Sequence, residues 1–415
     1  MNAIHREGTE LFIEGVSCRQ VAEKYGTPVF VYSRASIEQA WHAFDKALGG
    51  RKHLVCYAMK ANSNLAIINI LAKLGSGFDI VSGGELERVR AGGGDMSKVV
   101  FSGVGKTRDE IALALGAKIR CFNIESIGEI EVLAEVAAAH GVQAPVSVRV
   151  NPDVDALTHP YISTGLRDNK FGISIEEAET AYQRLTDLPN LDIVGMDCHI
   201  GSQLTEISPY RDALQRLLLL SDKLAAQGIE LHHLDLGGGQ GIRYKDESTL
   251  DLDAWATAMN QEIGDRDLEI IVEPGRSIVG NSGLLLTTVN YLKHSSDKNF
   301  AIVDAAMNDL IRPALYSAWQ EIVPVLESDQ QSRCYDVVGP VCESGDFLGK
   351  DRDLSLQIDD LLAVLSAGAY SFCMSSNYNS RTRAAEVVID GSQMHLVRER
   401  ETIQALFAGE SVIPG

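Results

Sequence analysis

The sequence predicts an α/β protein with a (β/α)8 barrel and a C-terminal β domain. Its 415 residues exceed the usual size of one core, which predicts two domains. Strand and helix signals alternate from Leu54 to Glu273, whereas helical periodicity is weak after about residue 282. We expect an N-terminal segment (1–35) that packs with the β domain, a barrel (36–281) and a β-sandwich or β-barrel domain (282–415).

The barrel prediction rests on eight short apolar segments, which are typical of strands that are covered on both faces. These are Leu54–Met59, Phe78–Val81, Val99–Phe101, Ile119–Ile124, Val146–Val150, Ile193–His199, His232–Leu236 and Glu269–Val272. Helical periodicity lies between them, for example at Leu65–Leu74, Gly84–Ala91, Ile127–His140, Ile175–Thr186 and Arg211–Gln227. A doubly wound open sheet is the alternative for the same alternation.

The flanking segments have different patterns. A turn and strand at 26–32 precede a helix at 35–48, for which Ser33 is a plausible N-cap. Strands are expected at 284–292, 300–304, 336–339, 386–389 and 395–397. Asp390-Gly391 separates the last two strands and predicts a hairpin.

Composition excludes several classes of protein. A net charge of −20 argues against nucleic acid or an anionic membrane surface as a partner. No apolar run approaches the ~18 residues of a membrane span, and the polar N-terminus lacks the apolar region of a signal peptide. The seven cysteines are scattered and form no CxxC pair, which favours reduced thiols and a cytoplasmic location.

Chemistry in a barrel of this kind sits at the C-terminal ends of the strands. Five of the predicted strands end in polar or glycine-rich residues: Lys60, Ser82-Gly83-Gly84-Glu85, His199-Ile200-Gly201-Ser202-Gln203, Gly237-Gly238-Gly239 and Glu273-Pro274-Gly275-Arg276. Arg149 also lies near the end of its strand. We expect these groups to converge on one rim, which is more specific than any one of them.

Lys60 closes an apolar strand, where an ammonium is costly to bury unless it is used. A lysine that extends its amine to solvent is one interpretation. The other is a desolvated amine that forms a Schiff base with an aldehyde.

The other rim groups fit a phosphate-bearing aldehyde cofactor. Gly237-Gly238-Gly239 could form an anion nest, although a glycine run after a strand is often only a tight turn. Arg276 would add positive charge, and Glu273 would face a pyridine nitrogen unless it only pairs with Arg276. His199 would stack on the ring, the alternative being a structural histidine. Together with Lys60, these groups suggest pyridoxal phosphate.

Two other patterns are discounted. Gly103-Val104-Gly105-Lys106-Thr107 resembles the end of a P-loop, but Val100 occupies the position of its first glycine. His232 and His233 are adjacent in a strand and point to opposite faces, which makes a poor metal pair. We predict no metal site.

Longer motifs show that the chain resembles the diaminopimelate decarboxylases, pyridoxal-phosphate enzymes of the alanine-racemase-like fold. The resemblance covers essentially the whole chain. Its motifs in the barrel are 57–62 (YAMKAN), 149–153 (RVNPD), 159–165 (HPYISTG), 170–173 (KFGI), 199–203 (HIGSQ) and 273–276 (EPGR). Those in the β domain are 308–316 (NDLIRPALY), 339–346 (GPVCESGD) and 368–370 (GAY). Ala306 departs from the glycine usual in that family.

The resemblance implies roles for individual residues. Lys60 looks like the Schiff-base lysine, His199 like the ring-stacking residue and Glu273 like the pyridinium partner. The residues that look like phosphate ligands are Ser202, Gly238, Gly275 and Tyr370. Those that look like substrate ligands are Arg276, Arg312, Tyr316 and Glu343, and Cys342 resembles the acid that protonates the product carbon. In this family Cys342 and Glu343 serve the neighbouring subunit, so the resemblance implies a homodimer.

The implied reaction converts meso-2,6-diaminopimelate to L-lysine and CO2, the last step of lysine biosynthesis. The end of this substrate remote from the cofactor carries an amine and a carboxylate. Arg312 and Arg276 would bind that carboxylate, and Glu343 the amine. The alternatives are an arginine or ornithine decarboxylase of the same fold, or a protein that binds the cofactor without catalysis. A surface ion pair is the structural alternative for Arg312.

Overall fold

The computed structural model describes residues 3–154 and 169–415. The motif at 159–165 therefore lies outside the described residues. The chain divides into two compact units, a barrel unit (Glu38–Ile242 and Glu247–Ile278) and a β unit (Met1–Ile37, Arg243–Asp246 and Val279–Gly415). The boundaries predicted from the sequence, at residues 35 and 281, are not tested by this division and remain predictions.

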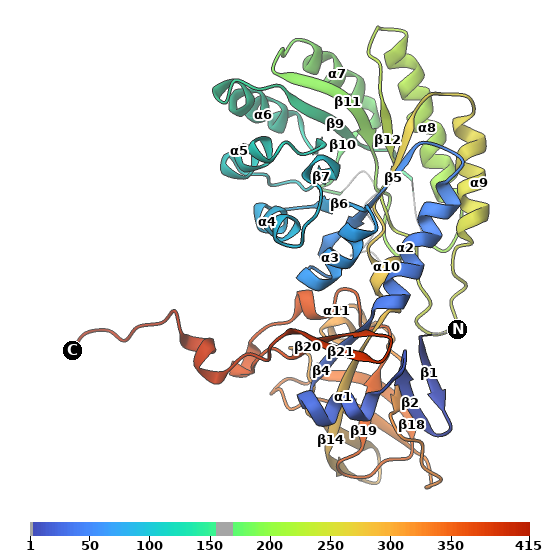
Figure 1. The fold of residues 1–415 in the computed structure, drawn as a ribbon, viewed down its shortest axis with the longest axis vertical. Coiled ribbons are helices and arrows are strands. Elements are labelled where there is room, and N and C mark those ends of the chain that lie inside the picture. The colour runs from blue at the N-terminus through green and yellow to red at the C-terminus, as the bar shows by residue number, and fades with distance from the viewer. Residues whose placement is uncertain (1–2, 155–168) are drawn as a thin grey trace. The chain divides into compact units, whose positions relative to one another are not determined.

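Eight parallel strands form the closed barrel (Figure 1). They are β5 (His53–Ala58), β6 (Gly77–Ile80), β7 (Val99–Phe101), β8 (Cys121–Ile124), β9 (Ala144–Asn151), β11 (Leu191–Asp197), β12 (His233–Asp235) and β13 (Glu269–Val272). The pairing of β8 with β9 closes the ring, and the two-residue strand β10 (Ile173–Ser174) adds to β9. The predicted barrel is therefore confirmed, and the open-sheet alternative is wrong.

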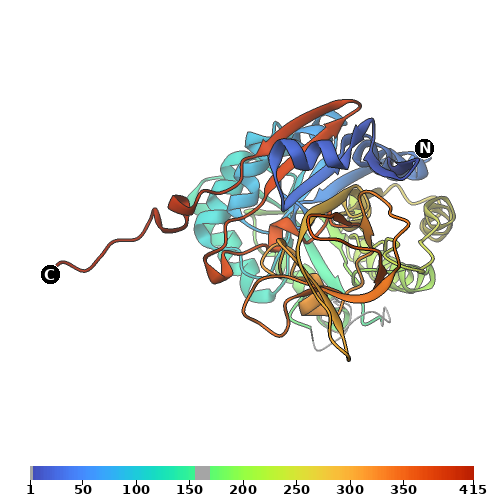
Figure 2. The same ribbon diagram turned by 90° about the horizontal axis from the view of Figure 1, so that it is seen from below.

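Helices lie on the outside of this ring in Figures 1 and 2. They are α3 (Leu65–Lys73), α4 (Gly83–Ala91), α5 (Arg108–Ala117), α6 (Ile127–Ala139), α7 (Ile175–Thr186), α8 (Ser208–Ala225) and α9 (Leu252–Ile263). Helix α2 (Arg34–Leu48) leads into the barrel, and the Ser33 hydroxyl accepts a hydrogen bond from the N–H of Ser36, as an N-cap does. Helices α5 and α9 were not among the helical segments expected from the sequence.

The β unit is built on a nine-stranded sheet. Its main path runs β18 (Phe347–Leu354), β17 (Arg333–Val338), β15 (Asn299–Val303), β14 (Gly283–Lys293), β4 (Val29–Ser33), β20 (Ala385–Asp390) and β21 (Gln393–Arg398). Strands β16 (Ile322–Pro324) and β19 (Leu361–Val364) pair beside β14. The hairpin predicted at Asp390-Gly391 is confirmed by the antiparallel pairing of β20 with β21.

The N-terminal segment contributes to this unit, as predicted. Strand β4 pairs with both β14 and β20. Ahead of it lie a small sheet of β1 (Ile4–Glu7), β2 (Glu10–Ile13) and β3 (Val16–Ser17), and helix α1 (Cys18–Tyr25). Ile13, Val21, Val31, Leu284 and Val387 belong to one buried apolar cluster, which ties these elements to the sheet.

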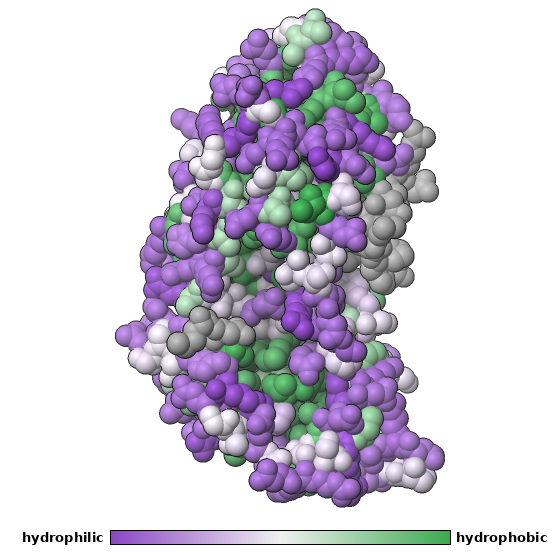
Figure 3. Space-filling view, turned by 90° about the vertical axis from the view of Figure 1, so that its right-hand side faces the viewer, coloured by the Kyte–Doolittle hydropathy of each residue, from purple (hydrophilic) through white to green (hydrophobic). Residues whose placement is uncertain are grey.

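The surface has a mixed character. Figure 3 shows one face, on which hydrophilic side chains predominate and apolar ones gather in small patches. No helix among the described residues has the length and apolarity needed to cross a bilayer.

Candidate active site

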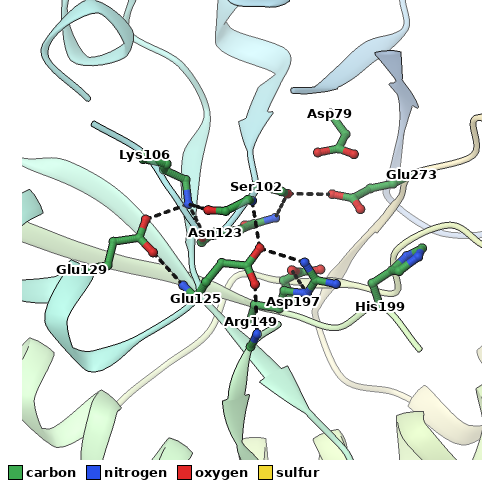
Figure 4. Close-up of polar contacts among 12 residues, drawn as sticks. Asp79, Ser102, Lys106, Asn123, Glu125, Glu129, Arg149, Asp197, His199 and Glu273 are labelled. Carbon is green, nitrogen blue, oxygen red and sulfur yellow. Dashed lines mark hydrogen bonds and ion pairs between the residues drawn. The ribbon is translucent and has the colours of Figure 1, made fainter. Parts of the chain in front are cut away.

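The interior of the barrel changes from apolar to polar toward the C-terminal ends of its strands. Leu54, Cys56, Val100, Cys121 and Ile271 form a buried apolar cluster. Side chains alternate between the two faces of a strand, so the next inward positions lie one layer higher. That layer is polar and buried, and its residues are Asp235 and, labelled in Figure 4, Asp79, Ser102, Asn123, Arg149, Asp197 and Glu273.

Lys60 lies just above this layer, in the short helical turn η1 (Met59–Ala61) that follows β5. Its Nζ is 2.7 Å from Oδ2 of Asp79, a fully buried carboxylate on β6. Ala58 and Asp79 are partners in the β5–β6 register, which brings the carboxylate beside the lysine. The lysine amine therefore faces the barrel interior, and an acidic group orients it.

His199 follows β11 and is held by the glycine turn after β12. Its Nδ1 accepts a hydrogen bond of 3.2 Å from the N–H of Gly238. Burial, with the nearby charges of Arg149 and Lys60, lowers the pKa of His199 well below its ordinary value. The imidazole is therefore neutral at physiological pH, which suits contact with an aromatic ring face.

The glycine turn has no room for side chains. A Cβ on Gly238 would lie 2.1 Å from the carbonyl oxygen of Glu273, and one on Gly239 would lie 2.2 Å from that of Gly201. The N–H groups are already in use: Gly237 donates to Asp235 and Gly238 donates to His199. A phosphate bound by the Gly238 N–H would have to share or replace the contact with His199.

Arg276 and Ser202 meet beside this turn. Arg276 begins the short helix α10 (Arg276–Val279), is largely buried, and donates from Nη2 to the Ser202 hydroxyl at 2.9 Å. Gly275 precedes it, where a Cβ would lie 3.0 Å from the carbonyl oxygen of Ala58. A guanidinium and a hydroxyl next to a glycine turn are suitable donors for a phosphate.

Glu273 follows β13 and is buried among other acids. The Ser102 hydroxyl lies 3.5 Å from its Oε1, and Asn123 donates to that hydroxyl at 3.1 Å. Burial, followed by the carboxylates of Asp235, Asp79 and Asp197, raises the pKa of Glu273 well above its ordinary value. A cation brought by a ligand would favour the ionised form, and a protonated pyridine nitrogen is such a cation.

A chain of charged groups runs along one side of the rim in Figure 4. The buried Lys106 donates to Glu129 at 2.7 Å, and Glu129 accepts the N–H of Glu125 at 2.9 Å. Glu125 binds Arg149 at 2.8 Å, and Arg149 lies 3.9 Å from Asp197. Lys106 also donates to the carbonyls of Gly103 and Asn123. It is thus a structural cross-link between the segments that follow β7 and β8.

In the β unit, Arg312 begins α11 (Arg312–Tyr316) and is 6% exposed. Its Nη1 donates to Gln320 Oε1 at 2.8 Å, and its guanidinium lies 4.4 Å from the ring centre of Tyr244. The surface ion pair considered for Arg312 is therefore wrong. Tyr316 ends the same helix and is half-buried.

The motif at 339–346 forms the loop between β17 and β18. Asp346 anchors it by accepting the N–H groups of Met307 and Val341, each at 2.7 Å. Cys342 and Glu343 lie exposed on this loop, and Glu343 accepts a hydrogen bond of 2.6 Å from the hydroxyl of Tyr378.

Two further predicted positions lie in the same unit. Tyr370 adopts a left-handed backbone with φ 53°. Ala306 is fully buried, and a Cβ built on Gly339 would lie 2.6 Å from its methyl carbon. The extra methyl at position 306 therefore fits because residue 339 has no side chain.

The donor set in the barrel fits the cofactor that the resemblance implies. Lys60, His199, Ser202, Glu273 and Arg276 come together as expected from the strand ends. Three acids were missed, Asp79, Asp197 and Asp235. Each is a charged residue with a buried apolar residue on either side of it in the sequence, and that pattern was the available signal. Two of them, Asp197 and Asp235, lie close to Glu273, and one carboxylate oxygen of each of these three residues lies within 4.8 Å of the others, a spacing at which such groups could hold a metal ion.

Comparisons with known proteins agree with this geometry. Residues 34–280 match the family model of the pyridoxal-dependent decarboxylases, pyridoxal binding domain. The chain is 61% identical to a diaminopimelate decarboxylase from Pseudomonas aeruginosa, with all of both chains covered. It is similar to a crystal structure of diaminopimelate decarboxylase from M. jannaschii in complex with L-lysine (TM-score 0.95, 38% identity, 100% of this chain and 98% of the other). The enzyme from Helicobacter pylori with L-lysine has a TM-score of 0.91 at 42% identity, with 94% of this chain and 98% of that chain covered.

The rim network generates a stability prediction. Lys106→Met would leave Glu129 buried without its cation, so we expect the free energy of unfolding in urea to fall by about 3 kcal/mol. Lys223→Met removes a lysine from an exposed pair with Glu179 and should cost under about 1 kcal/mol. Equal effects of the two substitutions would show that the Lys106 contacts carry no special stability.

Proposed function

The chain belongs to the pyridoxal-dependent decarboxylases, and we propose that it converts meso-2,6-diaminopimelate to L-lysine and CO2. The likeness to diaminopimelate decarboxylases over the whole chain is the observation that carries this proposal. When bound, pyridoxal phosphate supplies two things: an aldehyde, which condenses with an amine, and an aromatic ring, which accepts the electron pair released as CO2 leaves.

We propose the following roles for the barrel residues. Lys60 provides the amine that holds the cofactor, and Asp79 orients that amine through their 2.7 Å contact. His199 packs on the ring as a neutral imidazole, and Glu273 holds a proton on the ring nitrogen. The phosphate is bound by Ser202, Gly238, Gly275, Arg276 and Tyr370.

Substrate choice is assigned to the charged groups that read the remote end of the substrate. A guanidinium binds a carboxylate through paired hydrogen bonds, and an acidic side chain binds an amine. Arg312, Arg276 and Tyr316 would bind the remote carboxylate, and Glu343 the remote amine. Ornithine has no carboxylate at that end and would leave a buried guanidinium without an anion.

Cys342 is proposed to deliver the proton to the substrate carbon after CO2 leaves. Cys342 and Glu343 are exposed on their loop, as residues that serve a neighbouring subunit would be. We therefore propose a homodimer with shared active sites. No disulfide joins any of the seven cysteines, all of which lie among the described residues, and this supports the proposal of a cytoplasmic location.

Lys60→Ala is expected to abolish the absorbance band of the bound cofactor and the release of CO2 from diaminopimelate, because no other amine takes its place. Spectra of the protein after reconstitution with pyridoxal phosphate, together with a CO2 assay, measure this. Lys52→Ala alters an exposed lysine at the other end of β5 and should leave both readouts intact. A Lys60→Ala protein that keeps the band and turns over would refute the role.

Arg312→Leu is expected to lower kcat/KM for diaminopimelate. The loss of transition-state stabilisation should be about 2–4 kcal/mol, the cost of leaving the remote carboxylate of the substrate buried without its partner. Arg312→Lys keeps the charge but not the paired geometry, and should fall between Leu and wild type. Product analysis with diaminopimelate, ornithine and arginine tests the alternative substrates in the same assay. Unchanged kinetics in Arg312→Leu would remove this residue from the substrate site.

Cys342→Ala is expected to retain the cofactor band and lose turnover, because a methyl group cannot donate a proton. Cys373→Ala, another exposed thiol of the β unit, is the matched control and should keep turnover. Mixed dimers of Lys60→Ala and Cys342→Ala should regain part of the activity if sites are shared. Subunit exchange without any recovery would contradict the shared site.

A further inference from the structure

Three buried carboxylates stand side by side at the ends of neighbouring strands. Asp197 and Asp235 are direct partners in the register of β11 and β12. Asp235 is in turn the partner of Ile271, two residues before Glu273, so all three side chains point to the same face. Each places one carboxylate oxygen within 4.8 Å of the others.

Few cations are available to balance these charges. Arg149 lies 3.9 Å from Asp197 but is bound more closely by Glu125, at 2.8 Å. Lys60 is bound by Asp79. Asp197 Oδ1 and Asp235 Oδ2 are buried and have no hydrogen-bond partner. If all three acids were ionised, the cluster would contain repelling charges and buried acceptors without donors.

A proton held in common removes both problems. Carboxylates this close in a buried site cannot all ionise, and the proton on one of them becomes a hydrogen-bond donor to the next. It therefore supplies the donor that the buried oxygens lack.

The surrounding groups favour the same state. Burial, and then Asp235, raise the pKa of Asp197 well above its ordinary value. Burial raises the pKa of Asp235 to about 7, while the hydrogen bond from the N–H of Gly237 lowers it. The other charged groups that act on the cluster are Asp79, Lys60, Glu125 and Arg149. Three thiols, Cys56, Cys121 and Cys198, are also close, and burial raises their pKa values so that they stay neutral.

Asp235 is the member of the cluster with a fixed link to the cofactor groups. Its Oδ1 accepts the N–H of Gly237 at 2.8 Å, and the next residue, Gly238, donates to His199. One carboxylate thus shapes the glycine turn and borders Glu273. A change in the charge of Asp235 would therefore shift the pKa of Glu273, while the glycine turn keeps its conformation.

We propose that Asp235 is a positioning residue that shares a proton with Glu273 and Asp197, and that the charge of this cluster sets how firmly Glu273 holds a proton on the ring nitrogen of the cofactor. The proton moves only between carboxyl oxygens, so no other bond changes. The shared proton does not depend on the proposed function, whereas its effect on the ring nitrogen rests on it.

The first test is the infrared spectrum of the apoenzyme. At neutral pH the wild type should show absorption by protonated carboxylic acid that is weaker in Asp235→Asn, because the amide keeps the shape and removes a proton-binding oxygen. Asp309→Asn changes a carboxyl that is equally buried in the β unit, and its pKa of about 6 leaves it mostly ionised at the same neutral pH, so this variant should keep nearly all of that absorption. Equal absorption in wild type and Asp235→Asn would overturn the proposal.

Thermal unfolding of the same apoproteins adds a check with a defined sign. An acid whose pKa is raised by folding binds more protons in the folded state than in the unfolded state. The free energy of unfolding therefore falls as the pH rises from the ordinary pKa of an aspartate to the raised pKa of Asp235, about 7. The Tm of Asp235→Asn relative to wild type should therefore increase across this range. If Asp235→Asn does not fold, Asp197→Asn serves in both measurements, with the same expected direction.

The second test uses the holoenzyme. The absorbance of bound pyridoxal phosphate in the wild type should change as pH passes through neutrality, and this change should be absent in Asp235→Asn and present in Asp309→Asn. A purely structural role for Asp235 would not move a spectral titration. Persistence of the titration in Asp235→Asn would overturn the link to the ring nitrogen.

Two further outcomes separate the explanations. Metal analysis after dialysis against a chelator should find no stoichiometric cation, and a retained cation would replace the shared proton and overturn the proposal. If the infrared difference is found but the wild-type holoenzyme releases no CO2 from diaminopimelate, the proposed function fails and the shared proton stands.

Discussion

The excess of buried carboxylate over buried cation inside the barrel is the constraint on which the rest of the site depends. Asp79, Asp197, Asp235 and Glu273 lie in a layer where, among the described residues, Lys60 and Arg149 are the nearby cations. Burying charge in this way costs stability, and the surrounding strands impose it through their register. The arrangement makes chemical sense if a ligand brings positive charge, as a protonated pyridine ring does. Structural charges such as Lys106 are, by contrast, fully bonded within the protein.

Much of this site could be predicted from the sequence because the barrel places all strand ends on one rim. Lys60, His199 and Glu273 each close a predicted strand, so the fold alone brings them together. Asp197 and Asp235 are different, since their meeting depends on the register between β11 and β12, which no local pattern specifies. Strands β1, β2 and β3 were not predicted because none of them is longer than four residues, too short for a clear alternating pattern.

The β unit shows a different limit of sequence reasoning. Arg312 was singled out as a candidate from its motif, but its surroundings could not be predicted, because Gln320 and Tyr244 come from other segments. The Gln320 amide donates to the carbonyls of Leu365 and Ser366 at 3.1 and 3.3 Å. Its oxygen must therefore face Arg312. The orientation of the guanidinium is thus fixed by a backbone that is itself held in the sheet.

This fixed orientation bears on how a decarboxylase of this fold would select its substrate. A flexible guanidinium would lose side-chain entropy on binding an anion, of the order of 1 kcal/mol, and would adapt to several ligands. Arg312 has lost that freedom already, because an amide and an aromatic ring hold it from two sides. It therefore gains most from a carboxylate at one position and has little to offer an amine. If Arg312 binds the remote end of the substrate as proposed, rejection of a substrate with only an amine at that end follows from the unfavourable approach of two cations, with no added steric barrier.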